Sequence, residues 1–202
     1  MDKKLLTNLR TAYDQRAAWR DEKDYPHWKE RERAIFLEHL QRENKRTLLE
    51  IGAGPGRDSL FFQQNGLEVI ATDLSPEMVK LCRAKGITAY VMDFAGLEFP
   101  ELFDAIYGLN CLLHVPKKEL PAILQRLHGL LQPGGLFYMG MHGGQDFEGI
   151  YESDEHEPKR YFSLYLPEQI QAVVGRFFTP VYFQLIRLKS DSDVFQSMIW
   201  RT

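Results

Sequence analysis

The chain has 202 residues, a hydrophobic content of 44% and a formal net charge of −3 at pH 7. This length suits one well-buried core with appendages and is too short for two full domains, and the charge argues against a basic face that follows a phosphate backbone. No signal peptide and no run of about 18 apolar residues appears, so we expect a cytoplasmic protein without a membrane partner. The two cysteines, Cys82 and Cys111, are expected to be free thiols.

The first segment of the chain, residues 1–45, is charged and helix-prone, and Pro26 divides it into two predicted helices. We expect residues 1–46 to form an N-terminal helical lid on a core of residues 47–202, within a single domain. Aromatic residues are spread through the lid, and Tyr13 and Trp19 have two open roles. They either pack on the core as part of an amphipathic helix pair or form walls of a binding pocket.

The stretch 47–58, TLLEIGAGPGRD, joins a predicted buried strand, a glycine-rich turn and the start of a helix. Gly52, Gly54 and Gly56 remove the side chains that would keep a ligand away from the backbone. The helix that follows offers free N–H groups and a positive dipole end to an anion. The stretch therefore predicts a ligand site, although a tight structural connection would use the same glycines.

An acidic residue, Asp73, ends the next predicted strand and lies 73 − 52 = 21 residues beyond the first glycine. In a doubly wound sheet an acid at this place meets the hydroxyls of a ribose. The alternative role is a helix N-cap, which Ser75 before Pro76 already suits. The dinucleotide fingerprint requires glycine where Arg57 stands, so the spacing does not match that fingerprint.

From residue 47 onward strands and helices alternate, which predicts an α/β fold with helices on both faces of a parallel sheet. Strands are expected at 47–52, 68–73, 88–92, 104–109 and 135–141, and helices at 57–65, 76–85, 118–131 and 167–174. Residues 179–188 and 194–200 then read as two strands of a hairpin joined by 189–193. We expect a Rossmann-like, doubly wound, seven-stranded, mostly parallel sheet that ends in an antiparallel hairpin, with the site at the carboxyl ends of its strands.

Further candidate site residues follow the later strands. Asp93 and Phe94 end the third strand, where Asp93 is either a polar strand terminus or a hydrogen-bond acceptor for a ligand. The fourth strand leads into FDAIYGLNCLLHVP at 103–116, in which His114 is either a general base or a hydrogen-bonding structural residue. His142 follows the fifth strand. No cluster has convincing metal-ligand spacing, so we expect no metal.

These motifs resemble the class I S-adenosylmethionine-dependent methyltransferases, in particular the small-molecule group related to ubiquinone and menaquinone biosynthesis. The resemblance rests on EIGAGPG at 50–56, on AYDQRAAW at 12–19, on 103–116 and on RYFSLY at 160–165. It covers nearly the whole chain, with departures at 107–108 and 110–111.

The resemblance implies S-adenosylmethionine as cofactor, with its amino-acid part on the glycine turn, its ribose on Asp73 and its adenine beside Asp93. The cofactor contacts implied are Glu50, Gly52, Ala53, Gly54, Gly56, Asp73, Leu74, Met78, Met92, Asp93, Phe94, Leu109 and Asn110. The acceptor contacts implied are Tyr13, Trp19, Arg160, Tyr161 and Tyr165, with 142–165 as a substrate-side loop. A base is needed only for a protonated acceptor, and the catalytic candidates are His114, His142 and Tyr13.

The expected function is therefore in-line transfer of a methyl group to a small molecule, by a monomer or homodimer that does not bind nucleic acid. An NAD(P)-dependent oxidoreductase is disfavoured by Arg57 and by the closing hairpin. A nucleic-acid methyltransferase is disfavoured because no N/D-P-P-Y/F-type or Pro-Cys step follows the fourth strand. A non-catalytic relative stays open. The carboxylates of 143–159 outnumber Lys159 and Arg160, which predicts a neutral or cationic acceptor.

Overall fold

The computed structural model describes residues 2–188 and 194–202. Its elements, in chain order, are α1 (Lys3–Asp14), α2 (Ala17–Glu22), α3 (His27–Arg42), β1 (Thr47–Ile51), α4 (Arg57–Gln64), β2 (Glu68–Asp73), α5 (Pro76–Ala84), β3 (Thr88–Val91), β4 (Phe103–Leu109), the 3-10 turn η1 (Leu112–His114), α6 (Leu120–Gly129), β5 (Leu131–Gly143), β6 (Phe147–Ile150), β7 (Tyr161–Leu164), α7 (Pro167–Val174), β8 (Thr179–Arg187) and β9 (Val194–Arg201).

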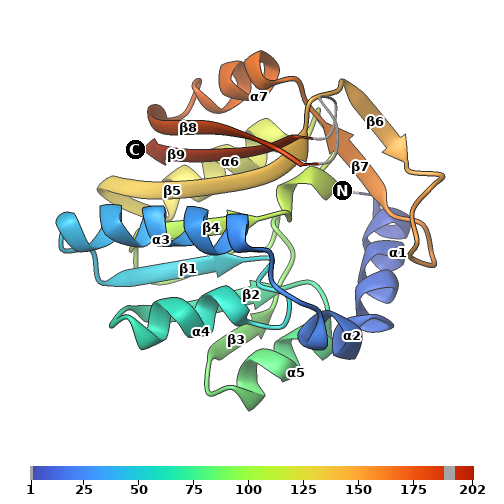
Figure 1. The fold of residues 1–202 in the computed structure, drawn as a ribbon, viewed down its shortest axis with the longest axis horizontal. Helices are drawn as coiled ribbons and strands as arrows, with labels where there is room; N and C mark the ends of the chain where they lie inside the picture. The colour runs from blue at the N-terminus through green and yellow to red at the C-terminus, as the bar shows by residue number, and fades with distance from the viewer. Residues whose placement is uncertain (1, 189–193) are drawn as a thin grey trace.

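The central sheet has seven strands in the order β3-β2-β1-β4-β5-β9-β8 (Figure 1). The strands β3, β2, β1, β4 and β5 pair in parallel, and β9 pairs antiparallel with both β5 and β8. The expected doubly wound, mostly parallel sheet with a closing antiparallel pair is therefore confirmed. The connecting residues Lys189 to Asp193 lie outside the described residues.

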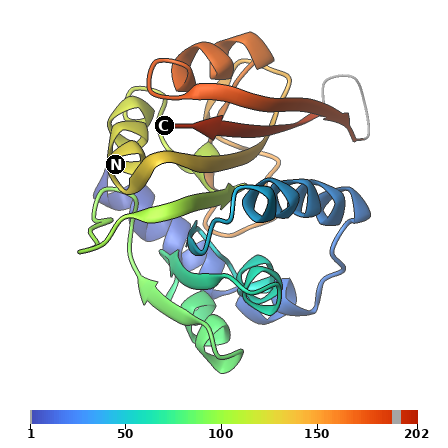
Figure 2. The same cartoon turned by 90° about the vertical axis from the view of Figure 1, so that its left-hand side faces the viewer.

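Helices cover both faces of the sheet, which Figure 2 shows with α3 in blue on one side and α6 in yellow-green on the other. Apolar side chains of α6 and α7 pack on one face, and those of α3 and α4 pack on the other. Strands β1 and β4 are buried on both faces, which explains their continuous apolar runs. No described helix is both long enough and apolar enough to span a bilayer.

The expectation of two helices before β1 was wrong, because the chain forms three. The first segment breaks at Gln15 and Arg16 as well as at Pro26. Helix α3 buries Phe36 and Leu40 against the sheet, so it is a layer of the core. Only α1 and α2 lie across the carboxyl ends of the strands (Figure 1).

The region between β5 and α7 also differs from the expected loop. It contains a second, two-stranded antiparallel sheet in which β6 pairs with β7, with Phe147 opposite Leu164 and Ile150 opposite Tyr161. The β5 strand begins at Leu131, where the sequence predicted the end of a helix. Both differences arise from tertiary pairing: four-residue strands carry little periodic signal, and Leu131 is held by pairing with Phe103.

Candidate functional site

The glycine turn after β1 has the backbone conformation that glycine permits. Gly52, Gly54 and Gly56 all have positive φ, at 63°, 56° and 81°. A Cβ atom on Gly52 would lie 2.3 Å from Cβ of Cys111, so a side chain there is excluded by the following segment. A Cβ atom on Gly54 would meet no atom within 4 Å. Gly54 therefore borders open space of the kind that a ligand can enter.

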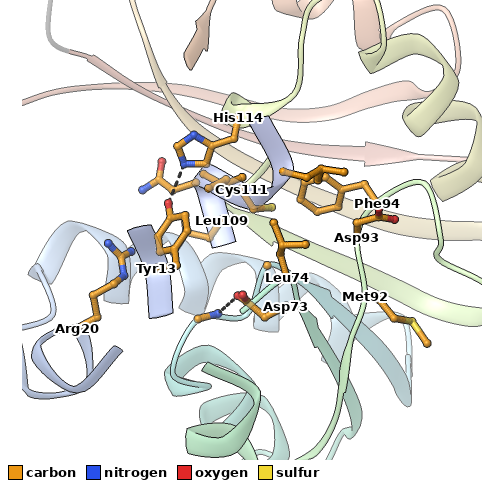
Figure 3. Close-up of a pocket in the computed structure, with 15 residues that line it drawn as sticks. Tyr13, Arg20, Asp73, Leu74, Met92, Asp93, Phe94, Leu109, Cys111 and His114 are labelled. Atoms are coloured by element: carbon orange, nitrogen blue, oxygen red, sulfur yellow. Dashed lines mark hydrogen bonds between the residues drawn. The ribbon is translucent and has the colours of Figure 1, made fainter. Parts of the chain in front are cut away.

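Asp73 ties this turn to the end of β2. One carboxylate oxygen accepts a hydrogen bond from N–H of Gly54 at 2.8 Å (Figure 3), and the other accepts from N–H of Ser75, also at 2.8 Å. The helix cap of α5 is Ser75, whose hydroxyl accepts from N–H of Met78, so Asp73 is not needed for that role. Burial raises the pKa of Asp73 above its usual value. A buried carboxylate thus borders the same space as Gly54.

Three adjoining cavities lie along this edge of the sheet. The narrow cavity, of about 70 Å³, is lined by Leu6, Leu9, Tyr13, Arg20, Gly52, Gly54, Asp73, Leu74, Met92, Asp93, Phe94, Leu109, Asn110, Cys111 and His114 (Figure 3). The central cavity, of about 560 Å³, lies between the glycine turn and the start of α3, and its lining includes Arg20, Lys29, Glu50, Ala53, Gly54 and Asn110. The outer cavity, of about 670 Å³, lies beside the β6-β7 hairpin, and its lining includes Trp19, Lys23, His142, Tyr151, His156 and Phe162.

Most of the residues expected to contact a cofactor come together at the narrow cavity, and Glu50 and Ala53 line the central one. Two of them line neither. Gly56 lies against α5, where a Cβ atom would come within 2.9 Å of Sγ of Cys82. Met78 is completely buried in α5. Gly56 and Met78 therefore support the glycine turn on the side that faces α5, away from the two cavities.

Asn110 adds an unsatisfied polar group to the site. It has a left-handed backbone with φ 53°, and its N–H donates to the carbonyl of Gly140 at 2.7 Å. Its side-chain oxygen is buried and has no hydrogen-bond partner. An unpaired buried acceptor costs about 1–3 kcal/mol. Because Asn110 lines both the narrow and the central cavity, a ligand donor can satisfy it.

A buried carboxylate pair lies beneath the central cavity. Glu50 accepts a hydrogen bond from Oγ of Ser59, and burial and the neighbouring Asp58 raise the pKa of Glu50 well above its usual range. Asp58 accepts from the hydroxyl of Tyr25 at 2.6 Å and from Arg33 at 2.9 Å. Sequence reasoning missed Tyr25 and Arg33 as partners of this site, since neither belongs to a motif and both reach it across the fold.

His114 is engaged at both ring nitrogens. Its Nδ1 lies 2.8 Å from the carbonyl of Tyr161, which can only accept, so Nδ1 carries the proton. Nε2 therefore accepts from the hydroxyl of Tyr13 at 2.7 Å (Figure 3), and that hydroxyl accepts from Arg160 at 3.0 Å. Burial lowers the pKa of His114 to about 3. Of its two open roles, the geometry favours the hydrogen-bonding one.

A second histidine, His156, has the free nitrogen that His114 lacks. Its side chain is buried, its Nδ1 lies 3.3 Å from a carboxylate oxygen of Asp154, and its Nε2 has no partner. Arg160 holds Asp154 with three hydrogen bonds of 2.7 to 2.9 Å. Burial, reinforced by Arg160, lowers the pKa of His156 to about 4. Sequence reasoning missed this residue because it stands in an acidic segment without a motif.

The residues expected to contact an acceptor separate into two groups. Trp19 and Arg160 line the outer cavity, as does the catalytic candidate His142, and Tyr13 lies beside this cavity against the ring of His156. Tyr161 and Tyr165 do not line the three cavities described above. The hydroxyl of Tyr161 donates to Glu148 at 2.7 Å, and Tyr165 is buried beneath Lys117, whose Nζ lies 4.6 Å from the ring centre.

The carboxylates of the segment 143–159 are mostly engaged. Asp146 pairs with Lys117, Asp154 with Arg160 and Glu152 with Lys159, and Glu148 accepts from Tyr161. Three of the six carboxylates are therefore balanced by a cation, and the expected repulsion of anions by this segment stays a prediction. Both cysteines are buried free thiols, as expected. Across residues 2–188 and 194–202, no three His, Cys, Asp or Glu side chains gather in a way that would hold a metal ion.

Comparison with known proteins agrees with this geometry. Residues 48–135 match a family model described as a methyltransferase domain. A ubiquinone biosynthesis O-methyltransferase of Xanthomonas campestris pv. campestris is 32% identical over 100 residues, which cover 46% of this chain and 41% of that protein. The corresponding enzyme of Xylella fastidiosa is 32% identical, with 40% of its length covered. The chain thus spans about two-fifths of the length of these curated relatives.

Solved structures share the fold over most of the chain. A 1,6-didemethyltoxoflavin-N1-methyltransferase of Burkholderia thailandensis, with bound 1,6-didemethyltoxoflavin and S-adenosylhomocysteine, has a TM-score of 0.74 at 23% identity and covers 96% of this chain and 86% of its own. The N-methyltransferase NodS of Bradyrhizobium japonicum WM9, in complex with S-adenosylhomocysteine, has a TM-score of 0.72 at 18% identity and covers 96% and 98%. Residues 48–135 thus match a methyltransferase domain in sequence, and the chain shares its fold with solved methyltransferases in complex with S-adenosylhomocysteine.

Proposed function

We propose that the protein binds S-adenosylmethionine along the carboxyl edge of its sheet and transfers the methyl group to a small-molecule acceptor. The observation that carries this proposal is one narrow cavity bordered by three complementary features. These are the open space at Gly54, the carboxylate of Asp73 and the unsatisfied side-chain oxygen of Asn110. Together they fit the parts of this cofactor.

Each feature suits one part of the cofactor. The backbone at Gly52 and Gly54 and the free N–H groups that open α4 would receive the amino-acid part. The oxygen of Asn110 would accept from its ammonium group. Asp73 uses one lone pair of each oxygen on the backbone, which leaves others for the two ribose hydroxyls. Asp93 and Phe94 would border the adenine.

When bound, the cofactor supplies an electrophilic methyl group on a sulfonium, and alignment with the acceptor supplies most of the catalysis. A neutral hydroxyl, amine or thiol loses a proton as it gains the methyl group. We propose Nε2 of His156 as the proton acceptor, since it is unpartnered and lines the outer cavity. A pKa of about 4 keeps His156 neutral near pH 7, so it could accept the proton of a hydroxyl or thiol, which becomes strongly acidic as the new bond forms.

The three earlier candidates take other positions. His114 has both nitrogens engaged and would orient Tyr13. His142 lines the central and outer cavities, with its ring centre 5.7 Å from that of Phe195, so it would border an acceptor. The hydroxyl of Tyr13 donates its hydrogen to Nε2 of His114 in this arrangement.

Calorimetric titration tests the cofactor assignment. We expect S-adenosylhomocysteine to bind and NADH not to bind. Transfer of tritium from labelled S-adenosylmethionine to a panel of phenols, thiols and amines would then identify the acceptor class. Absence of S-adenosylhomocysteine binding, or tighter binding of NADH, would overturn the proposal. Binding without transfer to any acceptor would favour a non-catalytic relative.

A further inference from the structure

Several cations line the central and outer cavities, where an acceptor would lie. Five positively charged side chains contribute to the central cavity: Arg20, Lys23, Lys29, Arg57 and Arg160. Arg20, Lys23 and Arg160 also line the outer cavity. The two cavities therefore meet at a positively charged boundary.

Three of these cations have no counter-ion among the described residues. Arg20 lies over the ring of Tyr13, with its Cζ 5.0 Å from the centroid, and Lys23 lies over the ring of Trp19 at 4.5 Å. Lys29 lies over the ring of Trp28 at 5.4 Å. No hydrogen bond or ion pair involves these three side chains in residues 2–188 and 194–202.

The other two cations are already satisfied. Arg160 is held by Asp154, and Arg57 donates to the main-chain oxygen of Asp21. The cluster of Arg20, Lys23 and Lys29 is thus the unbalanced part, and we call it the cationic cluster.

The carboxylates of the central cavity do not balance the cationic cluster. Asp58 is paired with Arg33, and Asp24 is exposed. Burial and Asp58 favour the neutral form of Glu50. Arg20 and Lys29 are half-buried, and a half-buried cation is stabilised by a nearby negative charge, so a bound anion would suit this cluster.

The titration of Lys29 reflects this imbalance. Burial lowers the pKa of Lys29 to about 8. The carboxylate of Asp58 opposes that shift, whereas the positive charges of Arg20, Lys23 and Arg57 reinforce it. An anion placed among them would restore the charged form of Lys29.

One part of the outer cavity has apolar walls. Trp19, Tyr151, Phe162 and Leu164 line this part, beside polar residues that include Gln145, Ser153, Asp154 and Glu155, and Trp19 is 43% exposed. Arg20 is the one member of the cationic cluster that lines both the narrow and the central cavity, so we assign to Arg20 the cofactor's own carboxylate, which the glycine turn would receive. Lys23 and Lys29 therefore remain for a second anion.

We propose that the methyl acceptor is a small organic acid, with one carboxylate held by Lys23 and Lys29 beside Arg20 and an apolar or aromatic body in the outer cavity. This inference rests on the proposed function, and it replaces the neutral or cationic acceptor expected from the sequence. The carboxylate offsets the charge of the cationic cluster, and the aromatic walls cover the body.

Binding of simple probes tests the acceptor class. The protein is saturated with S-adenosylhomocysteine and titrated with benzoate, phenylacetate and their amides, followed by ligand-observed NMR. We expect at least one acid to bind about tenfold more tightly than its amide. Lys29→Met should remove that preference, whereas Lys80→Met, at an exposed lysine of α5, should retain it. Thermal unfolding checks that both variants are folded.

The outcomes separate the two proposals. If S-adenosylhomocysteine does not bind, the proposed function is refuted. Normal cofactor binding with no preference for the acids refutes the inference alone. The inference is also refuted if Lys29→Met binds S-adenosylhomocysteine more weakly and still prefers the acids, because Lys29 would then belong to the cofactor site.

Proton uptake gives an independent readout. Calorimetry of benzoate binding near pH 8.5, in buffers of different ionisation enthalpy, should show protons taken up by the wild-type protein as Lys29 regains its charge. The Lys29→Met variant should show none. Equal uptake in both proteins, or none in either, would remove Lys29 from the anion site and overturn the proposal.

Discussion

The carboxylate of Asp73 accepts two backbone hydrogen bonds and borders the narrow cavity, so Asp73→Asn tests the assignment of the ribose. Asparagine keeps the shape and one acceptor oxygen but loses the charge. A charge-assisted hydrogen bond to one ribose hydroxyl contributes about 1.5–3 kcal/mol, so S-adenosylhomocysteine should bind about 10- to 150-fold more weakly. The amide also faces a backbone N–H donor, which should lower the free energy of unfolding by about 1–3 kcal/mol.

The chain offers a matched control at the opposite edge of the sheet. Asp104, near the start of β4, accepts from the N–H groups of Arg46 and Thr47 at 2.8 and 3.0 Å. The same oxygen of Asp104 accepts both, so the asparagine of Asp104→Asn can keep these bonds while it loses the charge, and the variant should leave affinity for S-adenosylhomocysteine unchanged. Calorimetry and thermal unfolding of both variants measure the two effects. Wild-type affinity in Asp73→Asn, or an equal loss of affinity in both variants, would refute the ribose assignment.

Four further results are expected. Gly54→Val places a branched side chain at φ 56° and into open space, so it should abolish S-adenosylhomocysteine binding by calorimetry while costing about 1–2 kcal/mol of stability; normal binding would make the turn purely structural. Cofactor binding should raise the hydrogen-exchange protection of α1 and α2 and leave that of buried α3 unchanged. An equal rise in all three helices, or no rise in any of them, would argue against a lid. His156→Gln should slow methyl transfer to an identified acceptor about 10²- to 10⁴-fold without weakening S-adenosylhomocysteine binding, and an unchanged rate would exclude it as the base. Because the folded-state pKa of His114 is about 3, below the unfolded value near 6.5, the free energy of unfolding should fall as pH drops from about 6.5 towards 3. Urea unfolding at several pH values measures this fall. It should be shallower in His114→Gln and unchanged from wild type in the control His27→Gln, at an exposed histidine.

The parts of the site that the sequence predicts are those set by local geometry. The number of residues between the glycine turn and Asp73 is set by one crossover, from β1 through α4 to β2, so it can be recognised in the sequence. The sheet order follows from the alternation of strands and helices for the same reason. Asp73 and Gly54 are 19 positions apart and are brought into contact by a single crossover.

The parts that were missed depend on contacts across the whole fold. His156 is brought to Tyr13 by the packing of the hairpin against α1, with ring centres 6.0 Å apart, and no periodicity encodes that approach. The hydrogen bond from Tyr25 to Asp58 likewise joins the N-terminal segment to the start of α4, and no periodicity encodes it. The aromatic residues of the lid were recognised as candidates, but their partners were not.

The hydroxyl of Tyr13 connects α1 to two partners that other residues hold in place. Asp154 holds Arg160, and the carbonyl of Tyr161 holds His114, whether or not Tyr13 is in place. If α1 acts as a lid, its closing over a ligand would engage two prearranged partners with a single side chain, and the entropy cost of ordering would fall on α1 alone. Its opening would break both hydrogen bonds together and leave their partners in place, so repeated cycles of entry and release would need no rearrangement of the pocket floor.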